Sequence, residues 1–263
     1  MDIHLNDMIK FGWVKRKENQ LQECLTFFNT STIRAWREKY THEMAIASFR
    51  TSSSLNSQFG SVAAWLQQGE IIGKKIQCNP WNPTLFKEKL YEIRSLTRKK
   101  NPGEFLPTLK KICAECGVAI AIVRTPSGCR ASGATKFITP ERGLILLSFR
   151  YLSDDQFWFT FFHEAGHLLL HKEKLFLEDI ENVNPLNKEE IEANTFASNL
   201  LIPPHLRAQL NRISFTKRDI IGFATAAGIS PGIVVGQLQH MGRADFKNLN
   251  GYKRRYKWED IIT

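Results

Sequence analysis

The sequence predicts an α+β protein, in which a helical N-terminal region precedes a domain with a small antiparallel sheet and further helices. Three observations support this class. Apolar residues recur at helical spacing over residues 1–76, short apolar runs separated by turn residues follow over 118–149, and residues 157–171 form a helical segment that is apolar on nearly every side. We therefore expect the sheet to lie between two groups of helices along the chain.

The composition is that of an ordinary folded protein with an excess of positive charge. Of the 263 residues, 43% are hydrophobic, and 36 basic against 26 acidic side chains give a net charge of +10, which makes acidic partners such as nucleic acid a class to consider. No apolar run approaches the ~18 residues that span a bilayer, and no signal-peptide pattern is present. Five cysteines, an odd number, favour reduced thiols. We expect a cytoplasmic protein without membrane contact.

Two prolines within residues 78–83 mark the best candidate boundary between domains. We assign residues 1–82 to a helical region that serves as a connector or docks a partner, and residues 83–263 to the second domain. Asn82 is expected to cap the next helix, which Pro83 opens.

A further helix is expected after Pro107, with Gly117 ending it. Cys113 and Cys116 fall on the apolar stripe of this helix, without a second pair of cysteines or a nearby histidine. This placement favours core thiols over metal ligands or a redox pair.

Three apolar runs follow, at residues 118–123, 130–138 and 144–149. Turn residues at 125–128 and 139–143 separate them, and Gly133 interrupts the second run. The pattern predicts a three-stranded antiparallel meander.

The apolar helix carries the residues that predict chemistry. Ser153 begins a capping-box pattern, and the helix then presents His163, Glu164 and His167 in the spacing HExxH. Imidazoles at i and i+4 lie about 6 Å apart on one face, which suits two ligands of a tetrahedral zinc ion. Glu164 could then act as the general base for a zinc-activated water. HExxH also arises by chance, but burying these polar residues in an apolar helix would be costly without a function such as metal binding.

The next helix, at residues 188–201, supplies a third ligand. Glu190 shares a face with small residues that would let this helix lie close to Ala165 and Gly166, which favours Glu190 as the ligand. Two alternatives remain open: Glu190 could only cap the helix together with Asn187, and Glu192 is the second choice of ligand.

Two further residues are candidates for supporting the ligands from behind. Asn194 lies one turn after Glu190, and His171 lies one turn after His167. His171 could equally be a cation placed near the C-terminus of its helix.

Taken together, these motifs resemble the ImmA/IrrE family of metallo-endopeptidases, a zincin group. The resemblance rests on residues 163–171, 190–197 and 200–203, extends to 132–135, 147–151 and 228–235, and covers most of residues 84–245. It implies a zincin-like domain in which His163, His167 and Glu190 bind zinc and Glu164 is the general base.

The resemblance also implies a regulatory function. Characterised relatives cleave, or otherwise inactivate, a helix-turn-helix repressor encoded beside them, in stress responses, mobile elements and toxin-antitoxin-like pairs. Many relatives carry their own N-terminal helix-turn-helix domain, and this chain departs from that pattern. We therefore expect a separately encoded DNA-binding partner, docked by residues 1–76.

The C-terminal part of the chain raises the question of DNA contact. Residues 213–245 resemble a helix-turn-helix, but the second segment, at 232–236, is apolar where a recognition helix needs polar side chains for base edges. We interpret it as a packed helical hairpin, so direct DNA contact is not favoured. The basic residues 253–257 suit phosphate, an acidic protein or simply a solvated end.

Two functions follow from different classes of protein. The first is a zinc endopeptidase that binds one extended segment of a repressor or antitoxin along an edge strand of the sheet. The alternative is a non-proteolytic regulatory or antitoxin subunit that uses the same fold to bind protein or DNA.

Overall fold

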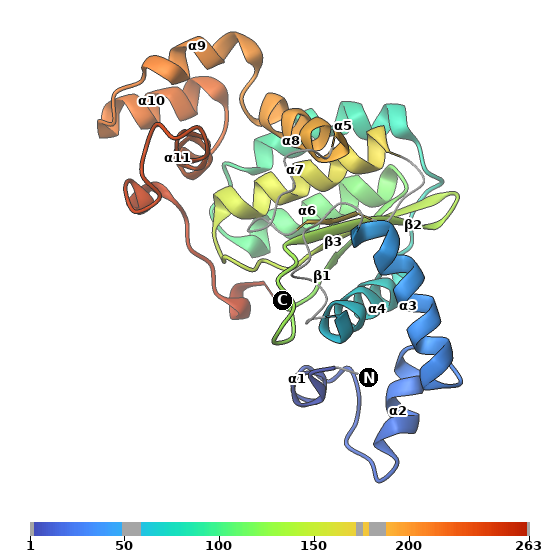
Figure 1. The fold of residues 1–263 in the computed structure, drawn as a ribbon. Coiled ribbons are helices and arrows are strands. Elements are labelled where there is room, and N and C mark those ends of the chain that lie inside the picture. Colours follow the sequence, from blue (N-terminus) through green and yellow to red (C-terminus); the bar gives the residue numbers. More distant parts are fainter. Residues whose placement is uncertain (1–2, 49–58, 172–175, 179–187, 262–263) are drawn as a thin grey trace.

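A mixed sheet lies between helices on both of its faces (Figure 1). The computed structural model describes residues 3–48, 59–171, 176–178 and 188–261. In the described chain the strands follow the order β1 (Val118–Ile122), β3 (Arg142–Leu147), β2 (Gly133–Thr139) and β4 (Phe176–Glu178). The α+β class is confirmed.

The predicted antiparallel meander is wrong in one pairing. β2 pairs with β3 in antiparallel fashion, but β1 pairs with β3 in parallel, with Val118 opposite Gly143 and Ile122 opposite Leu147. β3 thus occupies the place beside β1 that a meander would give to β2. Apolar runs indicate which segments form strands, but the partner of each strand depends on which one the helices bury in the middle of the sheet.

The two faces of the sheet are covered by helices from different parts of the chain. On one face, α4 (Phe59–Lys75) packs Val62, Trp65 and Leu66 against alternate strand residues, among them Ala119 and Leu146. On the opposite face, α6 (Pro102–Glu115) and α7 (Asp154–Leu170) cover the intervening residues, which include Ile120, Ile145 and Leu147. The boundary at residues 82 and 83 stays a prediction, although α4 on its N-terminal side shares a core with the sheet.

The helices on the second face begin at α5 (Pro83–Leu96) and α6 (Pro102–Glu115). Asn82 caps α5 as predicted, because its Oδ1 accepts the backbone N–H of Leu85 at 2.9 Å. α6 begins before Pro107, at Pro102, so the predicted start was too late.

Burial explains how α6 tolerates an internal proline. Pro107 removes one intrahelical hydrogen bond, but Phe105 beside it is fully buried, with its ring centroid 5.0 Å from that of Trp158. Cys113 and Cys116 are also fully buried, which confirms them as core thiols.

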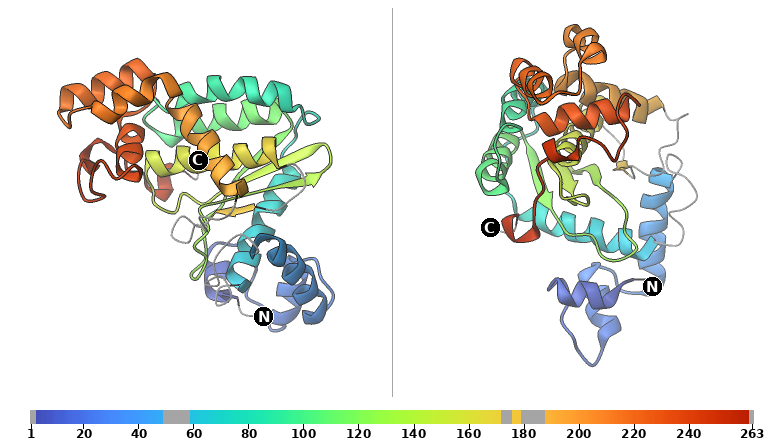
Figure 2. Two further views of the ribbon diagram at one scale, coloured as in Figure 1. Left: turned by 45° about the horizontal axis from the view of Figure 1, so that its top comes forward. Right: turned by 90° about the vertical axis from the view of Figure 1, so that its left-hand side faces the viewer.

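The N-terminal region is helical, as predicted. Its helices are α1 (Leu5–Lys10), α2 (Gln20–Phe27) and α3 (Ile33–Ser48), and they form a smaller core with α4 that contains Met8, Phe28, Trp36 and Tyr40. Figures 1 and 2 place α1–α3 at the end of the molecule opposite α9–α11.

The C-terminal helices are α9 (Pro204–Arg212), α10 (Lys217–Ala227) and α11 (Pro231–His240). α11 packs against α7 and buries Ile233, Val234, Val235 and Leu238, which confirms a packed helix where DNA recognition would need an exposed one. α10 and α11 meet at 104°, so the pair forms a corner rather than an antiparallel hairpin. Among the described helices none is by itself long and apolar enough to cross a membrane, although this bent pair passes on combined length and composition.

The C-terminal tail, residues 250–261, contains the basic residues 253–257 between two short helices, η2 (Asn250–Tyr252) and η3 (Trp258–Asp260). This tail folds back onto the start of α7. The Nζ of Lys253 lies 2.7 Å from Oδ2 of Asp155, and both side chains are buried. Arg254 donates from Nη1 to the carbonyls of Thr97 and Lys99 at 2.9 and 2.6 Å. The interpretation of this segment as a solvated end is therefore wrong for Lys253 and Arg254.

The buried carboxylates at the start of α7 explain this arrangement. Ser153 occupies the N-cap position but makes no side-chain cap, so the predicted capping box does not form. Asp154 instead accepts hydrogen bonds from Ser230 Oγ at 2.7 Å and from the backbone N–H of Arg254 at 3.0 Å. Burial raises the pKa of Asp154 to about 6. The tail and α11 thus supply the donors that these carboxylates need inside the protein.

We predict that Lys253→Met destabilises the fold by about 3 kcal/mol or more, because the charge of Asp155 then stays buried without its partner. Urea unfolding of the variant and of Lys257→Met, an exposed cation of the same tail, provides the comparison. Equal stability of the two variants would contradict a structural role for the Lys253 ion pair.

Candidate metal centre

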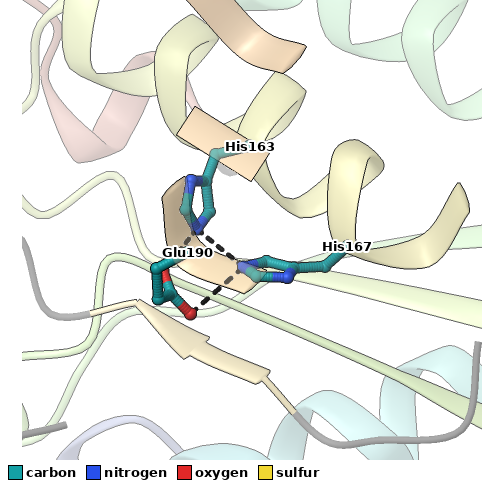
Figure 3. A group of neighbouring side chains, drawn as sticks. All are labelled: His163, His167 and Glu190. Atoms are coloured by element: carbon teal, nitrogen blue, oxygen red, sulfur yellow. Dashed lines mark hydrogen bonds and ion pairs between the residues drawn. The ribbon is translucent and has the colours of Figure 1, made fainter. Parts of the chain in front are cut away.

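Three side chains from two helices converge in the interior next to the sheet (Figure 3). His163 and His167 project from α7, and Glu190 projects from α8 (Lys188–Leu201). The two Nε2 atoms lie 2.9 Å apart, and the carboxylate oxygens of Glu190 lie 3.2 Å from Nε2 of His163 and 3.3 Å from Nε2 of His167. All three residues are buried. The structure thus brings together the three residues that the sequence predicts as ligands.

Small residues let α8 approach α7 closely enough for this contact. A Cβ atom on Gly166 would lie 3.4 Å from the backbone Cα of Ala193 and 3.1 Å from the ring of Phe196. Ala193 and Ala197 are fully buried in the same interface. The predicted small-residue face of α8 is therefore the face that meets α7, and it places Glu190 at the histidine pair.

The outer nitrogen of each histidine also has a partner. Nδ1 of His163 lies 2.9 Å from Oδ1 of Asn194, and Nδ1 of His167 lies 3.1 Å from Nδ1 of His171. Asn194 and His171 are thus placed where supporting residues were expected, with the Nε2 atoms of His163 and His167 facing each other and Glu190.

Of the two alternatives to Glu190 as the third ligand, the structure describes the residue of one, Glu192, but not Asn187 of the other. Glu192 lies outside the three-residue group, because its Oε2 is 2.9 Å from Nε2 of His171 and its side chain is 43% exposed. Asn187, the proposed partner in a helix cap, lies outside the described residues. Glu190 itself contacts both imidazoles.

The surroundings set the protonation states that a metal ligand needs. Burial lowers the pKa of His167 to about 4, and the neighbouring His163 adds to this effect. Burial by itself would raise the pKa of Glu190, but hydrogen bonds to His163 and His167 outweigh it and hold that pKa far below its usual range. At neutral pH the site therefore presents a neutral imidazole at His167 and an ionised carboxylate at Glu190, the forms that bind metal.

The donor set fits a divalent metal ion. One ligand atom from each of His163, His167 and Glu190 lies within 4.8 Å of the other two. Two imidazoles and one carboxylate are the ligand types of catalytic zinc sites, in which three protein ligands leave a position for water or substrate. We conclude that these three residues could hold a metal ion.

Glu164, the fourth predicted site residue, is fully buried beside strand β2. A Cβ atom on Gly133 would lie 2.5 Å from Oε1 of Glu164 and 2.6 Å from Cγ2 of Thr160. Only a residue without a side chain leaves the carboxylate this space. The contact of Gly133 with Glu164 was not predicted, although a lone glycine inside a strand indicates close approach of another group.

The comparison with known families agrees with this site. Residues 118–238 match the model of a peptidase family that is described as the IrrE N-terminal-like domain. The matched segment runs from β1 to α11 and contains every site residue named above. This match confirms the resemblance to the ImmA/IrrE family. A search of curated proteins gives no match.

We predict that Gly133→Ala displaces the Glu164 side chain and destabilises the fold by about 1–3 kcal/mol, because the added methyl group overlaps atoms that have little room to move. Urea unfolding measures the change. Gly222→Ala is the control, since a Cβ atom there meets nothing within 4 Å and alanine favours the helix. A Gly133→Ala variant as stable as the wild type would show that the strand can give way.

Proposed function

Because residues 118–238 match the model of a peptidase family described as the IrrE N-terminal-like domain, we propose that this protein is a zinc-dependent endopeptidase. The observation that carries the proposal is the buried group of His163, His167 and Glu190, with Glu164 following the first histidine on the same helix. A metal ligand set and a candidate general base are thus fixed on two packed helices, which favours precise geometry.

Each residue has a distinct part in this proposal. A zinc ion held by His163, His167 and Glu190 would supply a Lewis acid that lowers the pKa of a water molecule and polarises the peptide carbonyl. Glu164 takes the proton of the attacking water and delivers it to the nitrogen of the departing amine. Asn194 and His171 hold the rings of the two histidines.

The proposed substrate is a helix-turn-helix repressor or antitoxin that is encoded separately, in a stress-response, mobile-element or toxin-antitoxin-like system. Support comes from the family match and from the burial of α11, which packs its apolar residues inside the protein instead of presenting them to DNA. We further propose that residues 1–76 dock this partner. Residues Gly133–Thr135 of β2 already pair with β3 and with β4, so an extended substrate segment would add to an edge strand of the described sheet, β4 or β1, instead of β2.

The protein is expected to bind one zinc ion, and His163→Ala is expected to weaken binding by more than about 100-fold, because loss of a ligand costs more than loss of its supporting residue. Competition with a chromophoric chelator measures the affinity. His205→Ala, which removes an exposed histidine of α9, is the control and should bind zinc as the wild type does. A wild type that binds no zinc would refute the proposed metal.

Glu164→Gln is expected to leave zinc bound but to abolish cleavage, because an amide cannot accept the proton of the attacking water. The zinc-loaded protein and the variant are incubated with helix-turn-helix proteins encoded nearby, and fragment masses are recorded. Regulation that persists unchanged in the Glu164→Gln variant would instead favour the non-proteolytic subunit.

A further inference from the structure

We propose that Glu192, His171 and His167 form a hydrogen-bonded chain that fixes which nitrogen of His167 is presented for metal binding. His171 and Glu192 would then be positioning residues for the metal. The inference rests on the proposed function, because it concerns the same metal centre, but it assigns a function to a carboxylate that lies outside the group of three ligands.

The chain of contacts is continuous from the ligand to the protein surface. Nδ1 of His167 lies 3.1 Å from Nδ1 of His171, and Nε2 of His171 lies 2.9 Å from Oε2 of Glu192. The side chain of His171 is 7% exposed, whereas that of Glu192 is 43% exposed. The chain therefore begins at a buried ring and ends at a carboxylate in contact with solvent.

Local structure explains how His171 reaches this position. It is the C-cap residue that directly follows α7, and its backbone N–H still donates to the carbonyl of His167 at 2.9 Å. Its ring therefore lies over the turn that carries His167. On α8, Glu192 is two residues after Glu190, so the two carboxylates leave the helix in different directions, one toward the ligand pair and the other toward the end of α7.

Hydrogen-bonding capacity permits only one direction for this chain when Nε2 of His167 binds a metal. That nitrogen must then keep its lone pair, so the proton of the neutral ring sits on Nδ1, which donates to Nδ1 of His171. His171 can accept there only if its own proton is on Nε2, from which it donates to Glu192. An ionised carboxylate only accepts, so Glu192 fixes the direction of the whole chain.

The groups that face Glu192 suit a carboxylate that only accepts. Nε2 of His171 lies 2.9 Å from one of its oxygens, and Nζ of Lys188 lies 3.6 Å from the other. His163 is supported differently, by the uncharged amide of Asn194. The two histidine ligands thus have supports of different strength, and the carboxylate-terminated one belongs to His167.

The zinc affinity of the full-length protein tests the proposal. It is measured by competition with a chelator, without any substrate. His171→Ala removes the acceptor for His167 and is expected to weaken zinc binding by about 10–100-fold. His171→Asn keeps a polar atom near the position of Nδ1 but loses the link to Glu192, so its loss should be smaller. Glu192→Gln should match His171→Asn, and Glu88→Gln, which neutralises an exposed carboxylate of α5, should change nothing.

The double variant His171→Asn/Glu192→Gln distinguishes a chain from two separate effects. If Glu192 acts through His171, the double variant binds zinc as weakly as His171→Asn by itself. If the losses in zinc affinity multiply, Glu192 acts directly through its charge, and the proposal is wrong. An affinity of His171→Ala within twofold of wild type would also overturn it.

Two further measurements separate loss of the hydrogen-bonded chain from a damaged fold and from failure of the proposed zinc site. Thermal unfolding of each metal-free variant shows whether a change in zinc affinity reflects a damaged fold. If His171→Ala lowers the melting temperature, the milder His171→Asn takes its place in the comparison. Zinc binding by the wild type tests the proposed function separately. A wild type that binds zinc, with variants that bind it equally well, would refute the chain and leave the zinc site standing.

Discussion

The burial of polar side chains between α7 and α8 is the constraint on which the rest of this structure depends. Two imidazoles and the Glu190 carboxylate lie inside an otherwise apolar helix pair, where each would cost free energy unless it has a partner. The contacts between Glu190 and both histidines supply those partners. They require the helices to approach closely, which the small residues Gly166 and Ala193 allow. The close packing of the two helices is therefore also what gives the buried polar groups their hydrogen-bonding partners.

Polar contacts hold α7 at both ends: its acidic residues accept from other segments at its start, and a histidine contacts an acidic residue of α8 at its end. At its start, Asp154 and Asp155 receive donors from the C-terminal tail and from Ser230, the residue that also caps α11. At its end, His171 bonds to Glu192 of α8. Segments far apart in the chain thus fix the position of the helix that carries both histidines, as a rigid metal site requires.

These contacts show where charged side chains lie, which the net charge of +10 does not indicate. Lys253 and Arg254, which look like a basic surface in the sequence, turn toward buried acids and backbone carbonyls. α11, which holds the position of the second helix in the helix-turn-helix-like segment, buries its apolar face against α7. The excess of basic residues is therefore a weak guide to nucleic acid in this protein.

The local features of the fold and of the site follow from patterns among neighbouring residues. Spacing identified the helix with His163, Glu164 and His167, and the face of α8 that carries Glu190, because helical periodicity is a property of neighbouring residues. Asn82 as a cap and the buried thiols of Cys113 and Cys116 follow from the same kind of short-range pattern.

Contacts between distant segments could not be predicted in this way. The parallel pairing of β1 with β3, the contact of Gly133 with Glu164, the link from His171 to Glu192 and the inward turn of Lys253 each join residues whose separation along the chain carries no periodic signal. These contacts arise because buried charges and apolar strands need partners, and several segments of the chain could have supplied them. Packing around α7 selects among those segments, and that selection is visible only in three dimensions.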